Sequence, residues 1–379
     1  MEELEVSKEL FRYNNQDYVD KISRLYKWMH EKEAFPYKLI MYPTNRCNLS
    51  CPYCPNSFAR SSGRFKKEDE LTEEQWIKIT KEAIDLGVKE YRIFGGGEPM
   101  VRSKTTIDII NIVKDHNVNL NCEIITNGSL FTDEFVKNLV SKKLDRLLIS
   151  IDGPDSKTHD SLRGIPGTFE RTKRALKLFK ILKKKFRTDK PVIQVNMVVN
   201  NKNYNKIAKM VKVMYKLGVN ELALHSMRSY EETSNQVKSL GLNSEEEKKA
   251  ETEINRAKIL AKKRNLKLNI DMIEEEKNRN SNETDKPKFP SPICFEPFYT
   301  IFIDPKGNVA PCCGPGVGYK DCNVKQKSLK EIWFSNTFNL VRKEITEGKP
   351  KESCFSCGLL DMTRELRDDL LKFENKIEK

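Results

Sequence analysis

The chain has 379 residues, of which 38% are hydrophobic and 32% are charged, and its formal net charge is +13. This composition is typical of a globular protein, and no stretch approaches the roughly 18 apolar residues that a membrane span needs. Most of the excess positive charge is Lys on predicted helices such as 173–187, without a nucleic-acid-binding motif. We therefore expect a solvated basic face rather than a nucleic-acid or membrane partner.

The start of the chain, MEELEVSKEL, lacks the basic and apolar regions of an export signal, which predicts a cytoplasmic protein. The chain also contains ten cysteines. In a reducing compartment such cysteines indicate metal ligation rather than disulfide bonds. The length predicts one large domain with a smaller one attached.

Six short β-rich runs alternate with amphipathic helical runs in the first part of the chain. The predicted strands are 38–43, 91–95, 120–126, 145–151, 192–199 and 221–226. The helix 71–87 has a predicted capping box, Thr72 with Gln75, and Gly87 at its C-terminal end. This alternation predicts an α/β fold, with a parallel sheet curved into a partial (β/α)6 TIM-like barrel. In such barrels function gathers at the C-terminal ends of the strands.

Beyond residue 230 the alternation ends. A charged helix at 244–265 and a polar run at 274–292 predict a connection, followed by a hairpin turning at Asp304 to Asn308. A helix capped by Ser328 with Glu331 and a final helix at about 358–377 complete the chain. The predicted domains are an N-terminal helical extension (1–36), the barrel (37–230), a helical connection and linker (231–292) and a small C-terminal α+β module (293–379).

Three cysteines, Cys47, Cys51 and Cys54, lie within eight positions directly after the first predicted strand. A closed tetrahedral metal site needs four ligands, so this local set is one short. Three thiolates on an iron-sulfur cubane would leave one iron open for a small chelating molecule. The alternative from spacing alone is a zinc knuckle with a distant fourth ligand.

The stretch CNLSCPYC, with Tyr53 as its aromatic residue, resembles the CxxxCxΦC signature of the radical S-adenosylmethionine (SAM) superfamily. The stretch FGGGEP at 94–99 resembles the Gly-Gly-Glu-Pro motif that follows the second strand in this family. The resemblance covers roughly residues 38–226. It implies a partial barrel and a [4Fe-4S] cluster held by Cys47, Cys51 and Cys54, with SAM chelated at the open iron.

The resemblance also implies a set of SAM contacts at the ends of the strands. We expect consecutive glycines to adopt positive φ and approach a ligand closely, with Glu98 accepting from the SAM amino group. One of two arginines is expected to bind the SAM carboxylate. For Ser150 and Asp152 the alternative is ordinary capping at a strand end. The expected cofactor-binding residues are Tyr53, Gly95, Gly96, Gly97, Glu98, Pro99, Thr126, Asn127, Ser150, Asp152, Arg163 and Arg171.

The C-terminal module contains a second cysteine pattern, which resembles the SPASM/twitch auxiliary-cluster domains of radical SAM enzymes. No cysteine follows Cys357, so the single-cluster, twitch-like form fits better. Cys313 and Cys322 are possible substitutes, and zinc is a rival metal. The expected ligands of this second, auxiliary [4Fe-4S] cluster are Cys294, Cys312, Cys354 and Cys357.

Two kinds of residue stand apart from these motifs. Cys122 shares a strand face with apolar neighbours and is expected to be a buried small hydrophobe. His30, His116 and His159 are expected at the surface. His225, at the end of the sixth strand, is a weak catalytic candidate with a structural role as its alternative.

The resemblance implies that an external one-electron reductant of the flavodoxin or ferredoxin type drives cleavage of SAM to a 5′-deoxyadenosyl radical, which takes a substrate hydrogen. The auxiliary cluster would accept an electron, giving a net two-electron oxidation by a radical SAM oxidoreductase. A small polar or carbohydrate-like substrate is favoured, because about 37 residues precede the first strand. The alternative is a SPASM-type peptide or protein maturase, of the RiPP or sulfatase-maturase kind. A distant alternative is a non-catalytic iron-sulfur or zinc protein.

Overall fold

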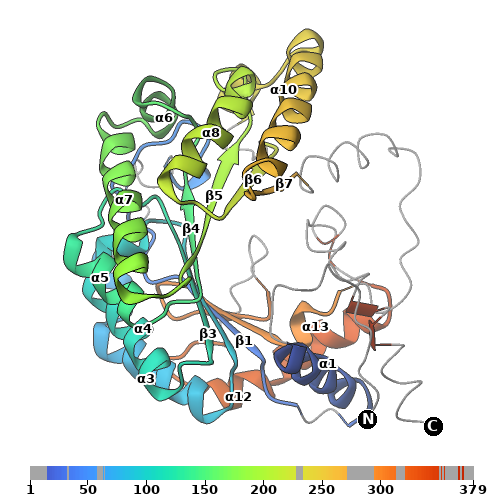
Figure 1. Cartoon of the computed structure of the whole chain (residues 1–379). Coiled ribbons are helices and arrows are strands. Elements are labelled where there is room, and N and C mark those ends of the chain that lie inside the picture. The colour runs from blue at the N-terminus through green and yellow to red at the C-terminus, as the bar shows by residue number, and fades with distance from the viewer. Residues whose placement is uncertain are drawn as a thin grey trace, which may run out of the picture.

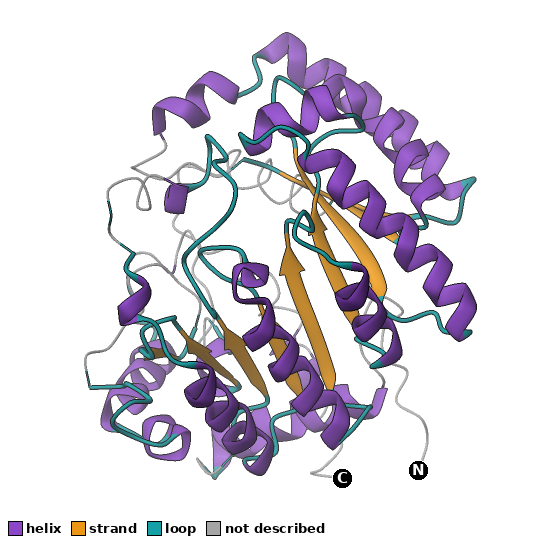
Figure 2. Ribbon diagram, turned by 90° about the vertical axis from the view of Figure 1, so that its left-hand side faces the viewer, coloured by secondary structure: helices purple, strands orange, loops and turns teal. Residues whose placement is uncertain are grey.

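The computed structural model describes residues 15–31, 34–57, 63, 65–227, 234–270, 294–312, 321–349, 351, 354, 366–367 and 369–370. Its strands form one curved sheet with helices packed along its outer face (Figures 1 and 2). The strands are β1 (Lys38–Met41), β2 (Glu90–Ile93), β3 (Asn121–Thr126), β4 (Arg146–Ser150), β5 (Val192–Val198), β6 (Glu221–His225), β7 (Lys267–Asn269), β8 (Thr300–Ile303) and β9 (Val309–Ala310).

Helices connect the strands of the barrel and form much of the C-terminal part. The α-helices are α1 (Asn15–His30), α3 (Glu73–Asp85), α4 (Ser103–His116), α5 (Asp133–Ser141), α6 (Ser156–Arg163), α7 (Thr168–Phe186), α8 (Ile207–Leu217), α9 (Ser234–Leu240), α10 (Ser244–Lys262), α12 (Leu329–Trp333) and α13 (Asn336–Thr346). The 3-10 helices are η1 (Lys67–Asp69), η2 (Pro99–Arg102), η3 (Tyr204–Lys206) and η5 (Glu296–Phe298).

The strand order is β7-β6-β5-β4-β3-β2-β1-β8-β9, and only the β8–β9 pair is antiparallel. The six predicted strands and the parallel barrel sheet are confirmed. Two pairings extend the prediction. After α10 the chain returns to the sheet as β7, so the β/α alternation runs one unit further than expected. The predicted hairpin forms, and its first strand β8 pairs in parallel with β1, so the sheet runs across the predicted boundary at residue 293.

The core lies between the sheet and its covering helices. In each barrel strand every second residue points outward and is buried, as expected for the period of two in a strand. On β3 these are Cys122 and Ile124, both 0% exposed, which confirms Cys122 as a buried small hydrophobe. The capping boxes Thr72 with Gln75 and Ser328 with Glu331 are both present. The predicted helix at 358–377 lies almost wholly outside the described residues.

The inner face of the sheet is polar near the beginning of the strands. Alternating charges cross it from β2 to β7, with Arg146 Nη2 at 2.7 Å from Glu221 Oε2 and Glu221 Oε1 at 3.9 Å from Lys267 Nζ. The row comprises Glu90, Arg92, Glu123, Arg146, Glu221 and Lys267. Because neighbouring charges oppose one another, these side chains satisfy each other and form the charged floor of the barrel.

Nearer the C-terminal ends of β1, β2 and β8 the inner face becomes aromatic. The ring of Tyr42 contacts Phe94 and Phe302 edge-on, at centroid distances of 4.6 and 4.5 Å. All three side chains are half-buried. This aromatic trio brings together the end of the first strand and the C-terminal hairpin.

Helix α1 packs against the C-terminal helices α12 and α13 (Figure 1). Arg342 of α13 is 5% exposed and lies between the rings of Trp28 and Trp333, with its guanidinium carbon 4.2 Å from each ring centroid. Its Nε and Nη1 donate to the carbonyls of Pro297 and Trp333 at 2.9 and 2.8 Å. This aromatic cage joins the two ends of the chain. No helix of the described residues is both long and apolar enough to cross a membrane.

Candidate iron-sulfur and SAM site

The cysteine loop directly follows β1 and therefore lies at the C-terminal edge of the sheet. Cys51 is 8% exposed, while Cys47 and Cys54 are half-buried, and all three are free thiols. The Leu49 N–H donates to Cys47 Sγ at 3.4 Å, and the Cys54 N–H donates to the Cys51 carbonyl at 3.2 Å. The loop thus presents three thiols on a short, internally hydrogen-bonded segment.

The glycine loop after β2 packs directly against the start of the cysteine loop. A Cβ on Gly97 would lie 2.0 Å from the carbonyl oxygen of Arg46, and one on Gly96 would lie 2.3 Å from Asn45 Oδ1. The Gly97 N–H donates to the Thr44 carbonyl at 3.2 Å. The expected positive φ is wrong, because Gly95, Gly96 and Gly97 all lie outside the left-handed region. Close approach of two backbones requires glycine here.

Glu98 is 2% exposed and links the glycine loop to the end of β3. Its Oε1 accepts from the Thr126 hydroxyl at 2.6 Å and from the Met100 N–H at 3.0 Å, while Oε2 accepts from the Asn127 N–H at 2.7 Å. Burial raises the pKa of this carboxyl, although its hydrogen bonds oppose the rise. Pro99 next to it is buried, and its carbonyl accepts from Thr106 of α4 at 2.9 Å. Acceptance from the SAM amino group stays a prediction.

A pair of asparagines connects β3 to the cysteine loop. Asn127 Nδ2 donates to Asn48 Oδ1 at 2.9 Å, and Asn48 Nδ2 donates to Ser129 Oγ at the same distance. Asn127 and Thr126 are both buried. The sequence analysis missed Asn48, whose only signal is its place between two cysteines of the motif.

Asp152 is 0% exposed and forms a hub beside the cysteine loop. Its carboxylate accepts from Tyr53 Oη, from the Val198 N–H at 2.9 Å and from Arg163, whose Nη2 lies 2.9 Å from Oδ2. Burial raises the pKa of Tyr53 well above its ordinary value, so its hydroxyl donates to this carboxylate. The structure therefore gives Tyr53 and Asp152, two expected SAM contacts, to each other.

His159 belongs to the same hub, and its expected surface position is wrong. It is 0% exposed on α6, and its Nδ1 accepts from the Asp152 N–H at 3.1 Å. Burial, together with the charge of Arg163, lowers the pKa of His159 to about 3. The ring is neutral and structural. His30 and His116 are exposed, as expected.

The two candidate arginines differ in what they contact. Arg163 is 9% exposed, with Nη1 3.9 Å from Cys51 Sγ and Nη2 on Asp152. Arg171, in the first turn of α7, is exposed, and its Nη2 donates to Thr168 Oγ1 at 3.4 Å. Ser150 is half-buried at the end of β4. The hub therefore includes Arg163 and does not include Arg171.

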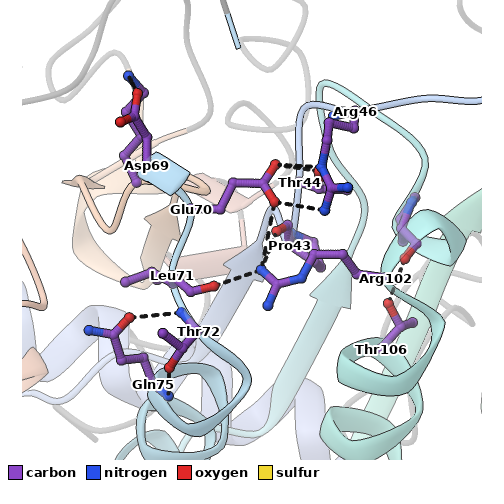
Figure 3. A network of polar contacts seen from close by, with 12 residues as sticks. Pro43, Thr44, Arg46, Asp69, Glu70, Leu71, Thr72, Gln75, Arg102 and Thr106 are labelled. Atoms are coloured by element: carbon purple, nitrogen blue, oxygen red, sulfur yellow. Dashed lines mark hydrogen bonds and ion pairs between the residues drawn. The ribbon is translucent and has the colours of Figure 1, made fainter. Parts of the chain in front are cut away.

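A further network, which the sequence analysis missed, holds the start of the cysteine loop (Figure 3). Glu70 accepts from the Thr44 hydroxyl and pairs with Arg46, whose Nη2 is 3.1 Å from Oε2. Arg102 Nη1 donates to the carbonyls of Pro43 and Leu71 at 3.1 and 2.7 Å. Figure 3 shows these side chains converging from three separate segments on the residues just before Cys47.

Of the auxiliary cysteines, the structure describes Cys294, Cys312 and Cys354, which are half-buried free thiols. Cys313 and Cys357 lie outside the described residues. Cys322 is 0% exposed within the apolar core and lies 3.8 Å from Ser335 Oγ, as a core residue would. His225, the weak catalytic candidate, is half-buried at the end of β6, where its carbonyl accepts from the Val199 N–H at 2.9 Å.

The donor set of the cysteine loop fits an iron-sulfur cluster. It combines three thiols with a guanidinium, which favours the thiolate form of Cys51 although burial raises its pKa. The adjoining glycine loop leaves a backbone surface without side chains. In the described part of the chain no three His, Cys, Asp or Glu side chains converge on a single ion. A [4Fe-4S] cluster instead takes one thiolate at each iron.

Comparison with known proteins identifies the family. The family model of the radical SAM superfamily matches residues 41–220, and that of an iron-sulfur cluster-binding domain, SPASM, matches residues 294–358. The chain belongs to the radical SAM superfamily. SAM and a [4Fe-4S] cluster are the cofactors of this domain, and the SPASM domain carries auxiliary iron-sulfur clusters.

Known proteins similar to this radical SAM chain differ in how much of it they match. The AdoMet-dependent heme synthase of Methanosarcina barkeri is 32% identical over 176 residues, which span 46% of this chain and 46% of that protein. The PqqA peptide cyclase of Methylocella silvestris is 28% identical over 341 residues, 85% of this chain and 80% of that protein.

A solved structure shows the same fold. The crystal structure of Streptococcus suis SuiB bound to the precursor peptide SuiA superposes with a TM-score of 0.62 and 19% identity, covering 95% of this chain and 78% of that chain. This similarity extends over both the barrel and the C-terminal hairpin.

Proposed function

We propose that this radical SAM enzyme oxidises a peptide or protein substrate. The observation that carries the proposal is the extent of similarity. The PqqA peptide cyclase matches 85% of the chain and SuiB, solved with the peptide SuiA, matches 95%, whereas the heme synthase matches 46%. The proteins that resemble both the barrel and the C-terminal part are thus ones whose names include a peptide.

The proposal differs from the sequence-based preference for a small polar substrate. That preference depended on the short segment before the first strand, whereas the full-length similarities support the alternative of a peptide maturase. Oxidation remains the reaction class that we propose. Removal of a hydrogen atom followed by loss of one electron gives a net two-electron change in the substrate.

Cys47, Cys51 and Cys54 would hold the first cluster. When SAM is bound, this cofactor pair supplies hydrogen-atom abstraction from a substrate C–H bond. We assign the SAM carboxylate to Arg171 rather than Arg163. The guanidinium of Arg163 already contacts Asp152 and Cys51, whereas that of Arg171 is exposed, with a single long hydrogen bond to Thr168.

The remaining SAM contacts that we propose lie on the ends of neighbouring strands. The glycine loop offers backbone groups, and Ser150 and Asn127 end β4 and β3 at the same edge of the sheet. Tyr53, Glu98, Thr126 and Asp152 would act from behind, because their polar atoms already bind one another. Pro99 fixes the exit of the glycine loop.

The inner face of the sheet supplies a place for the substrate. The aromatic trio of Tyr42, Phe94 and Phe302 is half-buried between the cysteine loop and the charged floor, and aromatic rings pack well against peptide side chains. The charged floor closes the other end of the barrel, which helps to exclude water from the reacting atoms. His225 would face this space from β6.

We propose that Cys294, Cys312, Cys354 and Cys357 hold one auxiliary cluster, which supplies one-electron transfer. Cys322 is not proposed as a ligand, because it lies in the apolar core. The reductant of the first cluster would be an external flavodoxin or ferredoxin type of protein. A cytoplasmic location agrees with the free thiols of the described cysteines.

The test begins with anaerobic reconstitution, iron and sulfide analysis, and reduction in the presence of SAM. We expect 5′-deoxyadenosine from the wild type and none from Cys51→Ala. The second step offers peptides encoded by short reading frames beside the gene, in parallel with a mixture of sugars and alcohols. We expect one peptide to lose a pair of hydrogens by mass spectrometry. Product from the sugar mixture alone would contradict the peptide proposal, and absence of SAM cleavage would leave a non-catalytic protein.

A further inference from the structure

The hub that joins Arg163, Asp152 and Cys51 has a role that binding of cofactors does not explain. We propose that Arg163 is a positioning residue that raises the reduction potential of the first cluster by fixing a positive charge beside Cys51. The proposal rests on the proposed function in one respect, namely that Cys51 is a cluster ligand.

The backbone fixes Arg163 against the cysteine loop. Its carbonyl accepts from the Ser50 N–H at 3.2 Å and lies 3.8 Å from Cys51 Sγ. Gly164 follows at φ +75°, and a Cβ there would lie 2.4 Å from the Ser50 carbonyl oxygen. The end of α6 therefore sits directly on the loop that carries Cys51, with no room for either segment to move independently.

The side chain is fixed as well. Arg163 Nη1 lies 3.9 Å from Cys51 Sγ, while Nη2 lies 2.9 Å from Asp152 Oδ2. Asp152 is held in turn by Tyr53, the Val198 N–H and His159, so it cannot follow a change in the guanidinium. Arg163 is 9% exposed, and its ion pair with Asp152 keeps it charged despite burial.

The sign of the effect follows from the two charges of the hub. Reduction adds one negative charge to the cluster, which a nearby guanidinium stabilises and a nearby carboxylate opposes. At Cys51 the influence of Arg163 exceeds that of Asp152, in keeping with the direct contact between the guanidinium and the sulfur. Because the hub is buried, dissolved ions screen this interaction weakly. The net effect favours the reduced cluster.

The experiment measures the midpoint potential in the reconstituted full-length protein by redox titration. The reduced first cluster is identified by electron paramagnetic resonance as the signal that changes when SAM is added to a parallel sample. The variants are Arg163→Gln, which removes the positive charge, Arg163→Lys, which keeps it, and Asp152→Asn, which removes the opposing charge. Lys157→Gln removes an exposed charge from the same helix and is the matched control.

We expect Arg163→Gln to lower the ratio of reduced to oxidised cluster at least tenfold at a given potential, which is about 59 mV for a one-electron couple. Arg163→Lys should stay within about threefold of the wild type, Lys157→Gln should not change the ratio, and Asp152→Asn should raise it. These opposite signs distinguish charge from general damage, because damage has no reason to favour reduction in one variant and oppose it in the other.

An unchanged potential in Arg163→Gln overturns the inference, as does an equal shift in Arg163→Lys. If Arg163→Gln assembles no cluster, Asp152→Asn decides, and a potential that is unchanged or more negative in that variant overturns the inference. Failure of the proposed function is distinguishable, because in that case the wild type itself shows no signal that responds to SAM.

Discussion

Gly97 is the position at which a single methyl group should separate the two loops of the cofactor site. The Cβ of a Gly97→Ala variant would lie 2.0 Å from the carbonyl oxygen of Arg46, 2.5 Å from the carbonyl carbon of Asn45 and 2.7 Å from the carbonyl carbon of Arg46. All three are backbone atoms, so no side chain can rotate away. The cysteine loop must move instead.

The magnitude follows from what that movement breaks. Two hydrogen bonds join the loops, from the Gly97 N–H to Thr44 and from the Glu98 N–H to Arg46, at 3.2 and 2.8 Å. Their loss costs about 1 kcal/mol each, and forcing a methyl into packed backbone costs about 1–3 kcal/mol. We therefore expect Gly97→Ala to lose about 2–5 kcal/mol of the free energy of unfolding.

The assay combines urea unfolding with iron content after anaerobic reconstitution, because the displaced loop also carries Cys47. We expect a lower unfolding midpoint and less iron bound by the first cluster. Gly241→Ala is the matched control, since Gly241 is exposed and a Cβ there has only Lys238 and Val237 carbonyls nearby, the closest at 3.3 Å. It should change stability by less than about 1 kcal/mol. A Gly97→Ala protein with wild-type iron and midpoint would refute the reasoning.

Three further predictions concern other buried groups. His159 has a folded pKa of about 3, below the unfolded value of 6.5, so the stability it contributes is present above pH 6.5 and is lost as pH falls towards 3. Between pH 6.5 and 5 the wild type should lose about 2 kcal/mol more than His159→Asn in urea unfolding, and equal losses would contradict a buried neutral imidazole. Arg342→Ala should lose about 3 kcal/mol, because it removes the cation from the aromatic cage and leaves carbonyls unpaired; tryptophan fluorescence during unfolding measures this, with the exposed Arg174→Ala as control. Cys294→Ala should lose the iron of the auxiliary cluster while Cys322→Ala retains it, and the reverse result would exchange the ligands that we propose.

Much of the barrel could be predicted from the sequence because its signals are local. Each strand is a short apolar run of its own, and the capping box of Thr72 with Gln75 spans four residues. The cysteine and glycine motifs likewise follow immediately after β1 and β2, so their meeting at one edge of the sheet follows from parallel pairing.

The pairing of β8 with β1 could not be predicted in the same way. Thr300–Ile303 is followed by a recognisable turn, which predicts a hairpin, but nothing in four residues indicates a partner at Lys38–Met41 more than 250 positions earlier. The choice depends on the open edge that the barrel leaves at β1. Strand β7 was missed because it has three residues and follows a long charged helix.

His159 shows why burial was predicted wrongly for a polar helix. The segment around it, SKTHDSLR, carries a helical pattern with few apolar residues, which is typical of an exposed helix. What buries the ring is a single backbone N–H, that of Asp152, which is left over at the end of β4 and needs an acceptor. Such a demand arises only after the strand and the helix are in place.

The same reasoning explains why so many polar residues surround the three thiols. A loop with three ligands can adjust to almost any cluster geometry and can also collapse, so its rigidity must come from neighbouring elements. The glycine loop contacts residues 44–46, Asn127 contacts Asn48, and α6 contacts Ser50 and Cys51. Successive strands and the helices after them thus each hold a different part of the loop. A fixed loop keeps its three sulfurs at one end of the site, so the fourth corner stays available to a ligand that the protein does not supply.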